Sequence, residues 1–236
     1  MKNGVAVVLQ ARMGSVRLPG KSLAPIGTRT ILGHCIERLR LRSGLPVIVA
    51  TSTLDEDDVI ATEAARYGAS TVRGSATDVL SRYVRAADVF GLTTIIRATA
   101  DNPAVDMDAP RRTLDLLERT GAGHVVEHGL PYGCAVEAID VEALRHADQI
   151  ATLEFDREHV TPFLKRDRTY MALDAIAPSD VRRSDVRLTV DTHEDLDYVR
   201  CVYERVEPTD GPPPLTELIA AADRLADQEE TGAGIR

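Results

Sequence analysis

Apolar residues follow two patterns along this chain, short continuous runs and longer segments in which they recur three and four positions apart. A strand covered on both faces is apolar at successive positions, whereas a half-buried helix is apolar at every third or fourth position. The runs predict strands at 5–9, 46–51, 70–72 and 93–99. The spaced segments predict helices at 31–41, 56–68, 77–91 and 111–121. This alternation predicts βαβ units around a parallel sheet.

The alternation becomes less regular after residue 123. Two short strands around a Pro–Gly turn are predicted within 124–139. The later segments predict helices at 141–147, 156–166, 193–206 and 215–227, and strands at 169–176 and 186–191. We therefore predict an α/β fold with a Rossmann-like, mixed but mostly parallel sheet and helices on both of its faces. A single domain is expected over 1–227, followed by a flexible tail at 228–236.

The composition fits a globular protein of this class. The chain has 236 residues, 44% of them hydrophobic, and no Trp, so its core is expected to consist mainly of Ala, Val, Leu and Ile. The net charge of −9 argues against a general nucleic-acid-binding protein. No apolar run approaches the ~18 residues of a membrane span, and no signal-peptide pattern is present. We therefore expect a cytoplasmic protein without membrane contacts, and the three separated cysteines predict no disulfide framework.

The charge is distributed unevenly, and this singles out the stretch QARMGSVRLPGK at 10–21. None of the first 36 residues is acidic, although an even distribution would place about six carboxylates there. The stretch follows the first predicted strand, and ligands of open parallel sheets bind beyond the carboxyl ends of the strands. Gly14 and Gly20 allow backbone N–H groups to approach a ligand, and Arg12, Arg17 and Lys21 supply positive charge. This combination predicts a polyphosphate site, with a solvated basic face as the alternative.

Two carboxylates are expected at the same edge of the sheet. Asp101 directly follows the strand at 93–99 and its Ala100, and Asp191 ends the run RLTVD. Mg²⁺ takes one or two protein carboxylates and completes its shell with water and phosphate oxygens, so such a pair beside a polyphosphate suits this ion. The alternative interpretation is that each aspartate caps the following helix. The sequence has neither GxxxxGK[ST] nor GxGxxG, which disfavours P-loop and dinucleotide-binding proteins.

Five stretches, in order along the chain, resemble the cytidylyltransferase family that activates acidic sugars, which includes the 3-deoxy-manno-octulosonate and acylneuraminate cytidylyltransferases. They are QARMGSVRLPGKSL (10–23), VRGSATDVLSRY (72–83), IIRATADNP (95–103), DREHVTPFL (156–164) and RLTVDTHEDL (187–196). The branch they resemble most is the spore-coat polysaccharide biosynthesis protein F group. The resemblance implies a fold of the nucleotide-diphospho-sugar transferase type, with a small β-rich insertion at 124–176 that serves dimerisation and acceptor binding.

The resemblance also implies a reaction, in which CMP passes from CTP to a 2-keto sugar acid and pyrophosphate leaves, with Mg²⁺ as cofactor and a homodimer as the assembly. It assigns catalysis to Arg12, Lys21 and Asp101. It assigns nucleotide binding to Leu9, Ala11, Arg12, Ser15, Lys21, Arg73 and Thr99, with Arg17 as a weaker candidate. Metal binding falls to Asp101 and Asp191, and acceptor binding to Glu137, Arg157 and His159.

The chain departs from its branch where the acceptor is expected to bind. Cys134 and Ala135 precede Glu137 where an acidic residue is usual, and NPAVD follows Asp101 where a Cys-Pro-Leu type of sequence is usual. Another acceptor, such as a phosphonate or a sugar phosphate, therefore stays open. Two further alternatives are a nucleotide-binding module without turnover, and a glycosyltransferase whose metal motif would be Asp106-Met107-Asp108.

Overall fold

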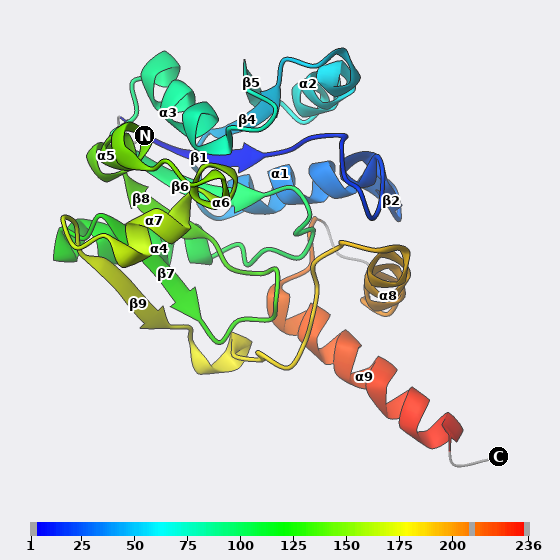
Figure 1. Ribbon diagram of the computed structural model, residues 1–236. Coiled ribbons are helices and arrows are strands. Elements are labelled where there is room, and N and C mark those ends of the chain that lie inside the picture. Colours follow the sequence, from blue (N-terminus) through cyan, green and yellow to red (C-terminus); the bar gives the residue numbers. More distant parts are fainter. Residues whose placement is uncertain (1–3, 208–210, 234–236) are drawn as a thin grey trace.

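The computed structural model describes residues 4–207 and 211–233 and has a seven-stranded sheet at its centre (Figure 1). The strand order is β5-β4-β1-β6-β8-β7-β9. The strands are β1 (Val5–Gln10), β4 (Val47–Ser52), β5 (Ser70–Gly74), β6 (Thr94–Thr99), β7 (His124–His128), β8 (Glu137–Asp140) and β9 (Ala172–Ile176). Only β8 runs antiparallel to its neighbours in this sheet, so the predicted mixed, mostly parallel arrangement is confirmed. A separate hairpin pairs β2 (Pro25–Ile26) with β3 (Arg29–Thr30).

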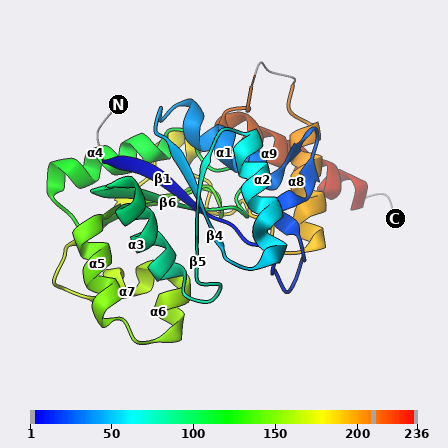
Figure 2. The same cartoon turned by 90° about the horizontal axis from the view of Figure 1, so that it is seen from above.

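Helices cover both faces of the sheet, as Figure 2 shows for α1 and α4 on one side and α3, α5 and α7 on the other. The helices are α1 (Ile31–Leu41), α2 (Asp58–Arg66), α3 (Val79–Phe90), α4 (Ala109–Thr120), α5 (Val141–Ile150), α6 (Glu154–His159), α7 (Thr161–Arg166), α8 (His193–Glu204) and α9 (Leu215–Ala233). Short 3₁₀ turns are η1 (Lys21–Leu23), η2 (Asp55–Asp57) and η3 (Ser179–Val181).

The continuous apolar runs are explained by a separate hydrophobic core on each face. Val5, Val7 and Leu9 of β1 pack with α1, α2 and α4, whereas Ala6 and Val8 pack with α3 and α5. Successive strand residues point to opposite faces, so a strand with a core on each side has no polar side. The helix boundaries also follow from the sequence, because the carboxylate of Asp78 caps α3 and Gly91 ends it with a φ of 61°.

Two predicted elements differ in the structure. The helix expected at 156–166 is two helices, because buried Val160 has a φ of 71° and interrupts it. A β-branched residue rarely takes this conformation, which costs on the order of 1–3 kcal/mol. The expected strand at 186–191 is no member of the sheet; it is an extended segment joined to the β7–β8 loop by a bridge between Arg187 and Tyr132.

The C-terminal part forms a third apolar cluster beside the sheet. Here α9 packs on α8 and on the extended segment through Leu215, Leu218 and Ala222. It then projects away from the sheet (Figure 1) and continues to Ala233, past the boundary at 227 where the sequence predicted a tail. Residues 234–236 lie outside the described part. No helix among the described residues has the length and apolar character needed to cross a membrane.

Gly133 holds the β7–β8 loop against the extended segment. Its φ is 95°, and a Cβ there would lie 2.7 Å from Thr189 Cβ and 2.8 Å from Asn102 Oδ1. We expect Gly133→Ala to lower the free energy of unfolding by about 3 kcal/mol, because the backbone strain and the overlap add. Gly27→Ala is the matched control: its φ of 58° gives the strain alone, about 1 kcal/mol, since nothing lies within 4 Å. Equal losses in urea unfolding would contradict the close packing at Gly133.

Candidate active site

The site begins where β1 and β6 end side by side. Gln10 pairs with Thr99 in the parallel register, and the amide of Ala100 donates to the carbonyl of Gln10 at 2.9 Å. From β1 the chain crosses to β4 on one side, while β6 lies on the other side, so the strand order reverses here. Such a switch point opens a crevice at the carboxyl edge of a parallel sheet, and ligands bind there.

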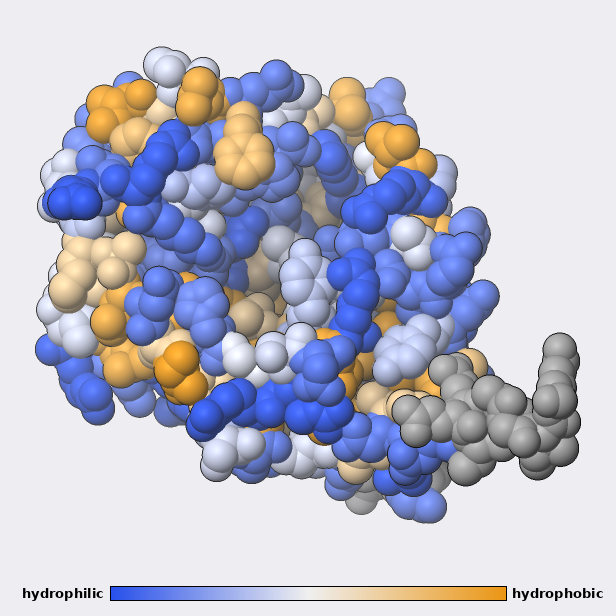
Figure 3. All heavy atoms as spheres, turned by 60° about the horizontal axis from the view of Figure 1, so that its bottom comes forward, coloured by the Kyte–Doolittle hydropathy of each residue, from blue (hydrophilic) through white to orange (hydrophobic). Residues whose placement is uncertain are grey.

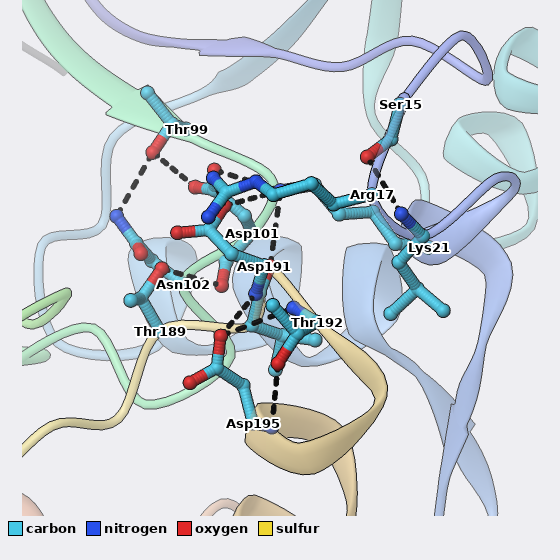
Figure 4. Close-up of polar contacts among 12 residues, drawn as sticks. Ser15, Arg17, Lys21, Thr99, Asp101, Asn102, Thr189, Asp191, Thr192 and Asp195 are labelled. Atoms are coloured by element: carbon cyan, nitrogen blue, oxygen red, sulfur yellow. Dashed lines mark hydrogen bonds and ion pairs between the residues drawn. The ribbon is translucent and has the colours of Figure 1, made fainter.

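The cationic loop at 11–20 is held at both of its ends. The amide of Met13 donates to Oδ1 of buried Asp57 at 2.7 Å, and the hydroxyl of Ser22 donates to the carbonyl of Arg12 at 3.3 Å. Gly20, with a φ of 72°, turns the chain so that its amide reaches the carbonyl of Met13 at 3.1 Å. These contacts place Lys21 at the start of η1, with its side chain directed into the crevice (Figure 4).

The ammonium of Lys21 lies between the two predicted carboxylates (Figure 4). Its Nζ is 3.2 Å from Asp101 Oδ2, 3.0 Å from Asp191 Oδ1 and 3.0 Å from the carbonyl of Val190. The amide of Val190 donates to the carbonyl of Asp101 at 2.8 Å, which holds the two segments together. The predicted convergence of Asp101 and Asp191 is therefore present, although an extended segment and not a neighbouring sheet strand brings Asp191 there.

Each carboxylate has further partners that fix its orientation. The hydroxyl of Thr99 donates to Asp101 Oδ1 at 2.6 Å, while Arg187 reaches Asp191 Oδ2 at 2.9 Å and Arg17 reaches Asp191 Oδ1 at 3.1 Å. Burial alone would raise the pKa of Asp191, but the hydrogen bond and charge of Lys21, followed by those of the arginines, hold this pKa below its ordinary value. Asp191 is thus ionised at neutral pH.

The structure excludes two alternative interpretations, that Asp101 and Asp191 cap helices and that Asp106-Met107-Asp108 is a metal motif. Thr192 is the residue that caps α8, in a capping box with Asp195, and α4 begins after Asp108, seven residues beyond Asp101. Within the Asp-Met-Asp string, Asp106 is buried and paired with Arg112, and Asp108 pairs with Arg42. This string does not supply a metal site of the glycosyltransferase type.

The donor set fits a magnesium ion that also binds phosphate. Asp101 Oδ2 and Asp191 Oδ1 both face the position of one ammonium, so both can face one cation. No group of three or more His, Cys, Asp or Glu within the described ranges could hold a metal by itself. Two carboxylate oxygens leave most of an octahedral shell to phosphate and water, which is how proteins usually bind Mg²⁺.

Two adjoining cavities open at this edge. The first, about 470 Å³, lies between the cationic loop, α3 and α6, and the second, about 570 Å³, lies between the β7–β8 loop and α6–α7. Their shared wall consists of Arg97, Thr99, Asp101, Tyr132, His159 and Asp191. Figure 3 shows that the molecule is hollowed near the middle of one face, with mainly hydrophilic residues around the hollow. The two cavities can hold two reactants that meet at the aspartates.

The structure brings most, but not all, of the predicted residues to these cavities. Those that line the first are Ala11, Arg12, Ser15, Arg17, Lys21, Thr99, Asp101 and Asp191, and Glu137 and His159 line the second. Leu9 is fully buried in β1 and lines neither cavity. Arg73 is also outside both, because it donates to the carbonyls of Ser52 and Leu54. Arg157 binds Asp78 and Asp148 and joins α6 to the start of α3.

The residues of the first cavity that the sequence did not predict include the polar side chains of Gln10, Arg82, Arg97 and Glu158. Arg97 could have been found from the sequence, because it is the charged residue in an otherwise uncharged strand. A charge at such a position requires a partner of opposite charge nearby. Arg82 could not have been found in this way, because one arginine in an amphipathic helix is usually exposed; here it is buried and donates to the carbonyl of Ala76 at 3.3 Å.

Glu137 is surrounded by four partners from three elements. Its carboxylate accepts from Arg97 at 2.6 Å and from Thr161 at 3.0 Å, and it contacts His124 at 3.2 Å and Lys165 at 2.8 Å. Burial would raise its pKa, but the charge of Arg97, with His124 and Lys165, holds this pKa well below the ordinary 4.5. Because the Glu137 carboxylate has four partners, it holds this wall of the second cavity in place. The positive charges at that wall belong to Arg97 and Lys165.

A Rossmann-like sheet with a cationic loop and two facing carboxylates at its switch point is the arrangement of a nucleotide-binding enzyme. The sequence profile described as Cytidylyltransferase matches residues 6–209, so this chain belongs to the cytidylyltransferase family, a family of nucleotidyltransferases. The resemblance seen in the sequence is thereby confirmed.

Individual relatives agree with this membership. The chain is 30% identical to spore coat polysaccharide biosynthesis protein SpsF of Bacillus subtilis, over 86% of this chain and 88% of that protein. It matches a cytidylyltransferase structure from Leptospira borgpetersenii with a TM-score of 0.85 and 30% identity over 95% of both chains. The structure of CMP:2-keto-3-deoxy-manno-octonic acid synthetase complexed with CTP shares the fold, with a TM-score of 0.64 at 16% identity over 85% of this chain and 98% of that one.

Glu137→Gln tests the charge cluster at the second cavity. We expect the free energy of unfolding to fall by about 3 kcal/mol at pH 7, because the guanidinium of Arg97, only 16% exposed, loses its counter-charge. A carboxyl with a depressed pKa stabilises the fold fully above its ordinary pKa of 4.5 and loses this contribution as the pH falls through its folded value. The difference between wild type and variant in urea unfolding should therefore narrow below about pH 4.5. Glu142→Gln, at an exposed carboxylate, should change little at any pH.

Proposed function

We propose that this protein is a Mg²⁺-dependent cytidylyltransferase that transfers CMP from CTP to a 2-keto sugar acid and releases pyrophosphate. The observation that carries the proposal is the convergence of Lys21, Asp101 and Asp191 at the switch point of the sheet, directly below a loop with two further cations. Family membership supports the nucleotidyl transfer. The CTP named for the octulosonate synthetase structure supports the donor.

The triphosphate is proposed to lie along the cationic loop in the first cavity. The side chains of Arg12 and Arg17 are 45% and 63% exposed and can turn toward phosphate oxygens, whereas Lys21 faces the cavity floor. The hydroxyl of Ser15 accepts from the amide of Leu18 at 3.4 Å and keeps its proton for a phosphate. The cytidine then extends toward Gln10, Val79 and Arg82 at the far wall, with Arg73 shaping the end of β4 from outside the cavity.

The chain's own groups have to position the reactants and neutralise charge, which is the main need of nucleotidyl transfer. The hydroxyl oxygen of the acceptor attacks the α-phosphorus and its proton passes to water. The bond between the α-phosphorus and the bridging oxygen breaks, and pyrophosphate leaves with the electron pair of that bond. Arg12 and Lys21 offset the charge that grows on the leaving group. Mg²⁺ held by Asp101 and Asp191 would neutralise phosphate oxygens and orient the α-phosphate.

The acceptor is proposed to occupy the second cavity, with its reacting oxygen at the wall shared with the first. His159 lies in that wall, and Lys165 and Arg97 supply positive charge for an acidic group. The name of SpsF refers to polysaccharide biosynthesis, and that of the octulosonate synthetase refers to a 2-keto sugar acid. Both names support the proposal that this chain activates such an acid for polysaccharide synthesis. The acceptor-binding set is thus His159, Lys165 and Arg97, with Glu137 as a positioning residue and Arg157 outside it.

A homodimer remains part of the proposal. The segment 124–176 ends in β9, an edge strand whose unpaired backbone groups face outward. Ala172, Asp174 and Ile176 alternate as exposed residues along it, and Ile176 is 68% exposed. An edge strand with exposed apolar side chains suits pairing with a second copy of the chain.

Pyrophosphate release measured with each of the four nucleoside triphosphates and a panel of 2-keto sugar acids tests the function. We expect turnover with CTP, an acidic acceptor and Mg²⁺, and a loss of about 100-fold or more in kcat for Asp191→Asn. Asp197→Asn is the matched control, since Asp197 is an exposed carboxylate on α8 that faces no cavity.

Each outcome discriminates between the alternatives. If CTP reacts only with a phosphonate or a sugar phosphate, that compound is the acceptor and the proposed 2-keto sugar acid is not. Metal-independent CTP binding without turnover, measured by calorimetry, would favour a binding module. Full activity of Asp191→Asn would rule out the proposed metal site.

A further inference from the structure

The contacts of Lys21 define the position of a cation. Its ammonium touches three oxygens, Asp101 Oδ2, Asp191 Oδ1 and the carbonyl of Val190, at 3.0 to 3.2 Å. Its side chain is only 14% exposed, so this is an enclosed position and not a transient surface contact. The two carboxylate oxygens are those that the proposed function gives to Mg²⁺.

We propose that Lys21 occupies the metal position while no nucleotide is bound, and that the triphosphate draws it away so that metal and CTP bind cooperatively. The proposal rests on the proposed function of the site. One ammonium and one divalent cation cannot both lie between the same two oxygens. The lysine therefore has two positions, one on the carboxylates and one on the phosphates.

The dimensions of the site support this assignment. Contacts of 3.0 to 3.2 Å suit an ammonium, whereas Mg²⁺ binds oxygen at about 2.0–2.1 Å. The carboxylates can close on a smaller ion, because each is held through its other oxygen: Asp101 Oδ1 accepts from Thr99, and Asp191 Oδ2 accepts from Arg187. Only the oxygens that face Lys21 have to move.

The charges around Lys21 also support the exchange of Lys21 for a metal ion. Lys21, Arg17 and Arg187 are in contact with the two carboxylates, and Arg187 also pairs with Asp195, so three positive charges already face three negative ones. A divalent cation arriving alone meets a site without excess negative charge. A triphosphate changes this balance, because it brings several negative charges that Lys21 and Arg17 can reach. Binding of metal and of nucleotide must then favour each other to the same degree.

Lys21→Met provides an unusual test, because removing a site residue should improve metal binding. Without nucleotide, titration with Mn²⁺ followed by electron paramagnetic resonance should give a Kd lower than in the wild type by about tenfold or more. Arg66→Met is the matched control: it also removes one positive charge from the chain, but Arg66 is exposed and contacts Glu63, away from both cavities, so its Kd should equal that of the wild type. Asp101→Asn combined with Lys21→Met should abolish the gain.

A Kd for Lys21→Met that is unchanged or higher would overturn the proposal. If Lys21→Met does not fold, Lys21→Gln replaces it, with the rise in Tm on adding Mn²⁺ as a second readout. The wild type gives an independent result that needs no variant. Saturating Mn²⁺ should expel Lys21 and raise its acylation by an amine reagent, measured by mass spectrometry, while acylation of Lys165 stays constant. Bound Mn²⁺ with unaltered acylation of Lys21 would contradict the exchange.

The two proposals fail in different ways. If the wild type binds no CTP by calorimetry in the presence of Mg²⁺, the proposed function is wrong. If CTP binds with Mg²⁺ but Lys21→Met leaves nucleotide-free Mn²⁺ binding unchanged, the function stands and only the exchange is wrong.

Discussion

The hydrogen-bonded register between β1 and β6 is the constraint on which the rest of the site depends. It places Gln10 beside Thr99, so that the cationic loop and the segment of Asp101 leave the sheet next to each other. A shift of one residue would turn every side chain of β1 to the opposite face and exchange its two cores. Val5, Val7 and Leu9 pack on one face while Ala6 and Val8 pack on the other, so the difference in side-chain size along β1 specifies the register.

The sequence predicted many residues that line the first cavity because their signals are local. Strand, loop and following lysine are contiguous, and the position of Asp101 follows from the end of β6. The second cavity depends on contacts between distant segments. Arg97, Glu137 and Thr161 come together only because β8 enters the sheet antiparallel beside β6, and the pattern of 124–139 did not indicate that placement. Asp191 meets Asp101 for a different reason from the predicted one, because the run 186–191 is not a strand of the sheet. Val186 and Leu188 join the third apolar cluster, and Val190 joins the core that contains Val5, Val7 and Leu9.

Arg73 and Arg157 show why residue type alone did not identify the site. Each lies in a stretch that matches the family, yet each makes its hydrogen bonds to the scaffold. Arginine has five donors in a planar fork, so it serves equally to join loop carbonyls and to bind phosphate. Exposure and local partners separate the two uses, and neither is visible in a sequence. Val160 is a similar case: its strained backbone, between His159 at the cavity wall and Thr161 on Glu137, has no signature in the residue itself.

The absence of carboxylates from the first 36 residues has a structural consequence. Cations of the loop find no acidic partner nearby in the chain, so they pair with residues more than 75 positions away: Lys21 with Asp101 and Asp191, and Arg12 with Glu158 at 3.5 Å. A local carboxylate would satisfy these cations permanently and compete with a phosphate. Long-range pairing instead keeps Arg12 and Lys21 at the wall of the first cavity, in contacts that the proposed triphosphate would replace. An acidic protein can in this way bind a polyanion, provided that its negative charge is kept out of one segment.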